Sequence, residues 1–191
     1  MSYEFTVNWA MPLAASLQSP QFTELFSKPV HVLELGVYEG RSSTMLIERM
    51  LPGSTYTGID RWYSAPDHLS AGVEKLARSN VTKATEGRDV KARLLKGYTS
   101  LLVPQLGDGG YDFIYIDADH SFSAALQDTQ LVWPKLKVRG ILLWDDVTWH
   151  KEPHAMYGAV GHAMLDFMSQ KPGHMLRFVS HDQVGVIKLK E

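Results

Sequence analysis

The sequence contains no cysteine, which excludes disulfides, cysteine-based zinc sites and a thiol nucleophile. It also contains no apolar run approaching the roughly 20 residues needed to span a bilayer. The apolar patch over residues 9–17 is interrupted by Pro12 and has no Lys or Arg before it, which argues against a signal peptide. Lys and Arg are scattered and the net charge is -2. We therefore expect a cytoplasmic protein that binds neither membranes nor nucleic acids.

The length and composition favour one domain over residues 1–191, because 191 residues with 45% hydrophobic content can form one sizeable core. Short apolar runs alternate with stretches of helical period. The predicted strands are 30–35, 56–59, 92–95, 111–116, 140–144, 175–179 and 184–189, and the predicted helices are 41–51, 71–78, 99–106, 122–136 and 153–168. This order predicts a Rossmann-like α/β fold with a mostly parallel seven-stranded sheet, helices on both faces and a C-terminal antiparallel hairpin. Residues 1–28 are expected to form an N-terminal helical extension.

Acidic residues stand at the ends of several predicted strands. Asp60, Asp117 and Asp145 each follow an apolar run, and Glu34 lies in the first strand, just before Gly36. In an open parallel sheet, ligands bind outside the carboxyl ends of the strands. The sequence therefore predicts a ligand site at this edge.

The turn after the first strand has the features of an anion-binding loop. Gly36 permits a tight turn, and Gly40 allows the following helix to pack closely on the strand. Ser42 lies in the first helical turn, where free backbone N–H groups favour a carboxylate. Tyr38 stands where a dinucleotide-binding loop would have its middle glycine, so a pyrophosphate would be crowded. The alternative is a purely structural turn with a helix-capping acid.

Four segments together resemble the catechol and caffeoyl-CoA type O-methyltransferases. They are residues 34–42, 97–106, 116–120 and 145–146. The overall pattern is closer still to methyltransferase family 24, whose members often begin with Phe-Thr and a Trp, as Phe5, Thr6 and Trp9 do here. The resemblance covers nearly the whole chain. It implies a class I methyltransferase that uses S-adenosylmethionine (SAM), without specifying the substrate.

The resemblance also implies roles for single residues. Glu34, Gly36 and Ser42 match positions at the methionine part of SAM, Tyr38 matches an aromatic residue beside it, and Asp60 matches a ribose ligand. The residues expected to bind the cofactor are Glu34, Gly36, Tyr38, Gly40, Ser42, Asp60, Gly97, Thr99, Ser100 and Asp117, of which Gly97, Thr99 and Ser100 lie on the adenine side.

A divalent cation is the second expectation from the resemblance. Asp117, Asp145 and Asp146 match the family's metal ligands, and Mg²⁺ prefers such oxygen donors. A substrate hydroxyl bound to the cation would lose its proton more readily. His120 stands where plant-type relatives carry a catalytic Lys, and an imidazole can accept that proton near neutral pH. The alternatives are a solvated strand end for the acids and a helix N-terminal role for His120.

The favoured function is therefore metal-dependent O-methylation of a small-molecule or sugar hydroxyl. Three other interpretations remain: a methyltransferase without metal or acting on nitrogen, a non-catalytic SAM-binding subunit, and an NAD-dependent oxidoreductase, which Tyr38 disfavours. No long insertion is available to cover the acceptor, so an open pocket or a homo-oligomer is expected.

Overall fold

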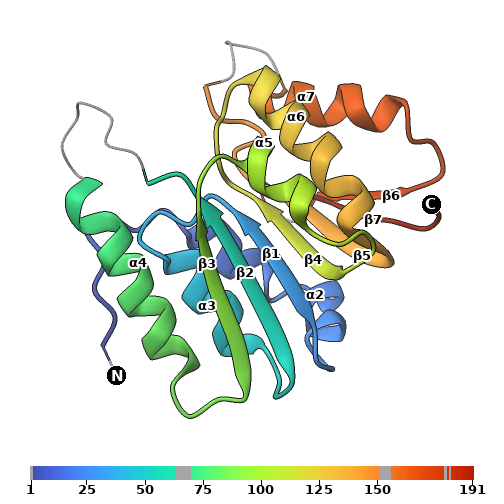
Figure 1. Cartoon of the computed structure of the whole chain (residues 1–191). Helices are drawn as coiled ribbons and strands as arrows, with labels where there is room; N and C mark the ends of the chain where they lie inside the picture. Colours follow the sequence, from blue (N-terminus) through green and yellow to red (C-terminus); the bar gives the residue numbers. More distant parts are fainter. Residues whose placement is uncertain (1, 63–69, 151–155, 179, 181) are drawn as a thin grey trace.

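The computed structural model describes residues 2–62, 70–150, 156–178, 180 and 182–191. Seven strands form one sheet in the order β3-β2-β1-β4-β5-β7-β6 (Figure 1). Their bounds are β1 His31–Leu35, β2 Ser54–Asp60, β3 Val90–Lys96, β4 Tyr111–Ile116, β5 Leu136–Trp144, β6 Met175–Phe178 and β7 Val184–Ile187. β1 to β5 are parallel, whereas β7 runs antiparallel to both β5 and β6. The predicted Rossmann-like sheet and its C-terminal hairpin are confirmed.

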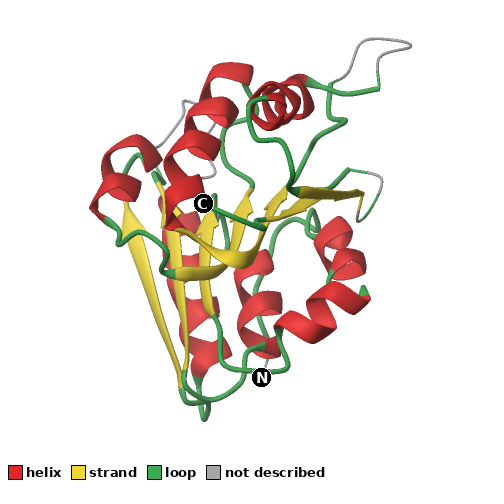
Figure 2. Ribbon diagram, turned by 90° about the vertical axis from the view of Figure 1, so that its right-hand side faces the viewer, coloured by secondary structure: helices red, strands yellow, loops and turns green. Residues whose placement is uncertain are grey.

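Helices cover both faces of the sheet (Figure 2). They are α1 Met11–Ser16, α2 Pro20–Leu25, α3 Arg41–Arg49, α4 Ser70–Thr85, α5 Thr99–Leu102, α6 Phe122–Val132 and α7 Ala159–Ser169. β4 shows how the two cores are separated: Phe113 and Tyr115 pack with α1 to α4, whereas Ile114 and Ile116 pack with α6 and α7. Successive strand residues point to opposite faces, so an apolar strand of this kind is buried on both sides.

Four elements are longer than predicted: β2 and β3 by a few residues at their ends, and α4 and β5 more clearly. α4 continues to Thr85, because Val73, Ala77, Val81 and Ala84 keep an apolar face buried at helical spacing. β5 begins at Leu136, and its pairing with β4 shifts register after the first residue. The predicted helix over 153–168 is described only as α7, from Ala159, and its first residues lie outside the described part of the chain. Among the described residues, no helix is both long and apolar enough to cross a membrane.

The order of the strands along the sheet reverses direction between β1 and β4. The residues that follow β4 and β5 remain hydrogen bonded to the neighbouring strand. The Asp117 N–H donates to the Leu35 carbonyl at 2.8 Å, and the Asp145 N–H donates to the Ile116 carbonyl at 3.0 Å. The carboxyl ends of β1, β4 and β5 therefore meet at one edge. This is the switch point, where ligands bind in open α/β sheets.

Candidate functional site

A cavity of about 400 Å³ lies over the carboxyl ends of β1, β2 and β4. This volume is within the range of small-molecule sites. The predicted residues that line it are Gly36, Tyr38, Ser42, Asp60, Gly97, Thr99, Ser100, Asp117 and His120. Four other predicted residues, Glu34, Gly40, Asp145 and Asp146, do not line it. The structure thus gathers most of the predicted cofactor-binding residues around one cavity.

The loop after β1 requires glycine for two different reasons. Gly36 has a φ of +85°, and a Cβ there would lie 1.7 Å from the backbone oxygen of Asp117. Gly40 has a φ of +79° and lies close to the backbone of α4. A Cβ at this position would lie 3.4 Å from the Cα and the carbonyl oxygen of Ala77. Tyr38, between them, adopts a positive φ of 51° without being glycine. The loop is therefore held against β4 on one side and α4 on the other.

Asp60 fixes this loop through its carboxylate. One oxygen accepts the backbone N–H groups of Val37 and Tyr38, at 2.9 and 2.8 Å, and the other accepts that of Trp62 at 2.7 Å. A carboxylate offers about four lone-pair positions, so these three bonds leave capacity for a ligand hydroxyl. Asp60 therefore holds the loop and also lines the cavity.

Glu34 lies beneath the loop and is fully buried. Its carboxylate accepts hydrogen bonds from the hydroxyls of Ser42, Ser43 and Tyr56, with 2.6 Å to Ser43. Burial raises the pKa of Glu34 to about 7, against the opposing effect of these three donors. In this structure Glu34 supports the start of α3 from below.

An extended N-terminal segment, residues 2–10, crosses the loop and contributes Val7, Trp9 and Ala10 to the cavity wall. Two buried side chains fasten it. Glu39 accepts the backbone N–H and the hydroxyl of Thr6 at 2.7 and 2.5 Å. Asn80 accepts the backbone N–H of Glu4 at 3.1 Å and donates to its carbonyl at 2.8 Å. Residues far apart in the sequence therefore complete one wall of the cavity.

We expect Asn80→Ala to weaken SAM binding by about tenfold, because residues 2–10 would lose two backbone hydrogen bonds worth roughly 1 kcal/mol each. Asn80 itself does not line the cavity, but it also donates to the Glu39 carbonyl at 3.0 Å, so the loss would come from the released segment and the loosened binding loop together. Calorimetric titration with SAM measures the change. Asn8→Ala, in the same segment but with an exposed side chain, serves as the control. Equal SAM affinity in the two variants would contradict a role for this segment.

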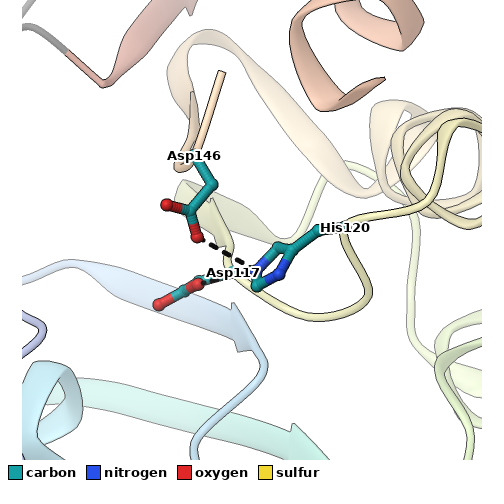
Figure 3. A group of neighbouring side chains, drawn as sticks. All are labelled: Asp117, His120 and Asp146. Atoms are coloured by element: carbon teal, nitrogen blue, oxygen red, sulfur yellow. Dashed lines mark ion pairs between the residues drawn. The ribbon is translucent and has the colours of Figure 1, made fainter. Parts of the chain in front are cut away.

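Three of the predicted polar residues meet at the end of β4. The Nε2 of His120 lies 3.0 Å from an Asp146 oxygen and 3.6 Å from an Asp117 oxygen (Figure 3). One donor atom from each residue falls within 4.8 Å of the others, so the three side chains are close enough together that they could share a metal ion. Asp146 reaches this position with a positive φ of 54°.

The three residues predicted as metal ligands are therefore only partly brought together. The structure brings Asp117 and Asp146 together with His120, whereas Asp145 is buried and its carboxylate accepts a hydrogen bond from the Tyr115 hydroxyl. Both acids lie beyond the end of β5, where the left-handed backbone of Asp146 directs its side chain away from that of Asp145.

The charges in this group perturb one another. The carboxylates of Asp117 and Asp146 raise the pKa of His120 to about 10. Burial, followed by repulsion from Asp117, raises the pKa of Asp145 to about 7. Burial also raises the pKa of Asp117. An excess of carboxylate that is only partly compensated by one imidazolium favours a cation.

Several residues of the site were not found from the sequence. Gln127 and Asp128 of α6 line the cavity, and Asp128 accepts a hydrogen bond from Thr99 at 2.5 Å. Burial raises the pKa of Asp128 to about 6. The sequence could have indicated Asp128, because this acid lies on the apolar side of the predicted helix 122–136. A buried acid at such a position needs a hydrogen-bond partner or a ligand.

One comparison with known proteins gives a family, and another gives a distant relative. A family model described as Methyltransferase domain matches residues 33–147. A curated relative, "Uncharacterized protein R132" of Acanthamoeba polyphaga mimivirus, is 23% identical over 141 residues, 73% of this chain and 61% of the relative. The chain thus spans about three fifths of that relative's length.

Solved structures share the fold at low sequence identity. Cofactor-bound Rv0187 from MTB is similar with a TM-score of 0.71 and 17% identity, covering 98% of this chain and 84% of that one. The O-methyltransferase from Bacillus cereus in complex with SAH has a TM-score of 0.63 and 15% identity, covering 95% and 82%.

Proposed function

We propose that this chain, which belongs to methyltransferase family 24, transfers a methyl group from SAM to a hydroxyl of a small molecule with the help of a divalent cation. The observation that carries the proposal is the placement of the acid–histidine group beside the cavity at the switch point, since Asp117 and His120 belong to both. Methyl donor and acceptor oxygen would then meet at one place, and positioning supplies much of the rate of such a transfer.

The cavity offers a matching group for each part of the methyl donor. The Asp60 carboxylate faces the cavity with spare lone pairs for ribose hydroxyls. Ser42 lies at the N-terminus of α3, where backbone N–H groups and the helix dipole favour the carboxylate of SAM. Thr99 and Ser100 border the other end, on the side assigned to adenine. Glu34 and Gly40 would support the binding loop without touching the donor.

The residues present fit a divalent cation. The Nε2 of His120 is buried, and no hydrogen bond satisfies it, although two carboxylates lie within 4 Å. Asp117, His120 and Asp146 would hold the cation, Mg²⁺ or a similar ion such as Mn²⁺ that accepts oxygen and nitrogen donors. The bound ion would polarise the acceptor hydroxyl. The role of His120 as general base stays a prediction. Cation binding disfavours it, because the ring nitrogen that would hold the ion cannot at the same time accept a proton.

Calorimetric titration of the purified protein with SAM, and separately with NADH, tests the proposal. We expect SAM to bind and NADH not to bind. Asp60→Ala should weaken SAM binding by 10- to 100-fold, or about 1.4 to 2.8 kcal/mol, because ribose acceptors and three loop contacts are lost together.

Asp89→Ala, at an exposed position before β3, is the control and should bind SAM as the original chain does. Binding of NADH in place of SAM would refute the proposal in favour of an oxidoreductase. If SAM binds, an acceptor screen follows, in which formation of S-adenosylhomocysteine from SAM is measured over a panel of phenols and sugar hydroxyls with and without Mg²⁺.

A further inference from the structure

Asp145 lies behind the acid–histidine group and not within it. The residue is only 6% exposed and does not line the cavity. Both of its carboxylate oxygens are engaged inside the protein: one accepts the Tyr115 hydroxyl, and the other accepts the backbone N–H of Asp146 at 2.9 Å. To face a cation, Asp145 would have to give up both bonds and leave a buried phenol without its acceptor, which is costly.

These two bonds connect Asp145 to both of the acids that do face the site. Through the first, it holds the Tyr115 hydroxyl, which also lies 3.4 Å from Oδ2 of Asp117, whereas His120 lies nearest to Oδ1 of the same carboxylate. Through the second, it holds the backbone of Asp146 in its left-handed conformation. A non-glycine residue keeps such a conformation only where its surroundings impose it. Asp145 therefore contacts each of the two neighbouring acids, directly or through one hydroxyl.

Tyr115 is in turn held on the face of the sheet that α1 covers. It is fully buried, and the side-chain amide of Gln183, at the start of the C-terminal hairpin strand, donates to its hydroxyl at 3.4 Å. The hydroxyl of Ser16, at the end of α1, donates to the Gln183 oxygen. All these groups are buried, so the chain Ser16–Gln183–Tyr115–Asp145 is shielded from water.

We propose that Asp145 is a positioning residue, which with Tyr115 orients Asp117 and Asp146 as cation ligands, and that the cation binds Asp117, His120 and Asp146 without Asp145. The inference rests on the cation-dependent function proposed above. Groups behind the ligands of a metal site typically change its affinity by 10- to 100-fold when removed. Tyr115 would have this effect although its hydroxyl never reaches the cavity.

The test is a titration of the full-length protein with Mn²⁺, in which free Mn²⁺ is counted by electron paramagnetic resonance, together with SAM affinity in the absence of metal. Tyr115→Phe should weaken Mn²⁺ binding by about 10- to 100-fold. Asp145→Asn should weaken it by less than about tenfold, because the amide oxygen can still accept the Asp146 N–H. Asp146→Asn, which removes the charge of a ligand, and His120→Ala, which removes a ligand outright, should lose more than either.

Tyr111→Phe is the matched control, since it removes a hydroxyl from a buried tyrosine at the opposite end of the same strand. It should leave Mn²⁺ affinity unchanged. Metal-free SAM affinity close to that of the original chain in Tyr115→Phe, Asp145→Asn and Tyr111→Phe, none of which changes a residue that lines the cavity, shows that a loss of Mn²⁺ binding does not reflect misfolding.

The result that overturns the inference is Mn²⁺ affinity unchanged in Tyr115→Phe while Asp145→Asn loses as much as Asp146→Asn, because Asp145 would then be a direct ligand. If the original chain binds SAM but no Mn²⁺, both this inference and the cation in the proposed function fail. If it binds Mn²⁺ but no SAM, the proposal that SAM is the methyl donor fails. The Mn²⁺ affinities of the variants still decide whether Asp145 is a positioning residue.

Discussion

We expect Gly36→Ala to abolish SAM binding and to lower the melting temperature by more than about 10 °C. A Cβ at this position would lie 1.7 Å from the carbonyl oxygen of Asp117 and 2.9 Å from the Ala118 Cα, both of them backbone atoms. No side-chain rotation can relieve this clash, so β1 and β4 must separate at the switch point. The loop that carries Tyr38 and the strand end that carries Asp117 would move apart, and both line the cavity.

Gly87→Ala is the matched control for this substitution. Gly87 also has a positive φ, +71°, but no atom lies within 4 Å of its would-be Cβ. The control therefore measures the cost of the left-handed backbone alone, about 1–2 kcal/mol, without the collision. We expect it to bind SAM normally and to melt a few degrees lower. Melting curves and SAM titrations of both variants check this. Equal melting temperatures and equal SAM affinities of the two variants would show that the close approach of Gly36 to Asp117 does not matter for stability or binding.

The sheet was predictable because its signals are local. The strand 111–116 was predicted with the bounds that the structure shows, since Tyr111 to Ile116 is an apolar run between a glycine turn and an acid. α4 was predicted too short, because the polar residues after Arg78 mask the continued spacing of Val81 and Ala84, which is recognised as a buried face only when the sheet beneath it is known.

The site was predictable as a set of strand ends but not as a set of side-chain directions. The positions of Asp60 and Asp117 follow from where β2 and β4 end. The separation of Asp145 from Asp146 depends instead on a backbone φ of 54° and on a buried tyrosine 30 residues earlier in the chain. Such long-range contacts leave no periodic pattern in the sequence.

The N-terminal segment illustrates the same limit. Residues 1–28 were predicted as a helical extension, and α1 and α2 do lie there. Nothing in the sequence of residues 2–10 indicates that they complete the cavity wall. Thr6 is bound by Glu39, 33 residues later in the chain, and Glu4 is bound by Asn80, 76 residues later. Only the fold brings these segments together.

Glu34→Ala should destabilise the protein by about 3–5 kcal/mol, because it leaves the buried hydroxyls of Ser42, Ser43 and Tyr56 without their shared acceptor and opens a cavity. The melting temperature would fall by about 10 °C. Glu24→Gln, at an exposed position in α2, is a surface control and should change little. A loss of less than about 1 kcal/mol in Glu34→Ala would contradict the structural role given to this carboxylate.

Glu34→Gln separates the charge of this residue from its shape. The pKa of Glu34 in the folded protein is about 7, above its ordinary value of 4.5, so the folded state binds more protons than the unfolded state between these values. The free energy of unfolding must therefore fall as pH rises from about 4.5 to 7. Gln cannot titrate, so the melting temperature of the original chain should fall more than that of the variant between pH 5 and pH 8, by about 5 °C. Other buried acids, such as Asp128, titrate in both proteins and cancel in the comparison. If the melting temperatures of the two proteins change with pH by the same amount, Glu34 stays ionised in the folded protein. Its three hydroxyl donors would then outweigh the effect of burial on its pKa.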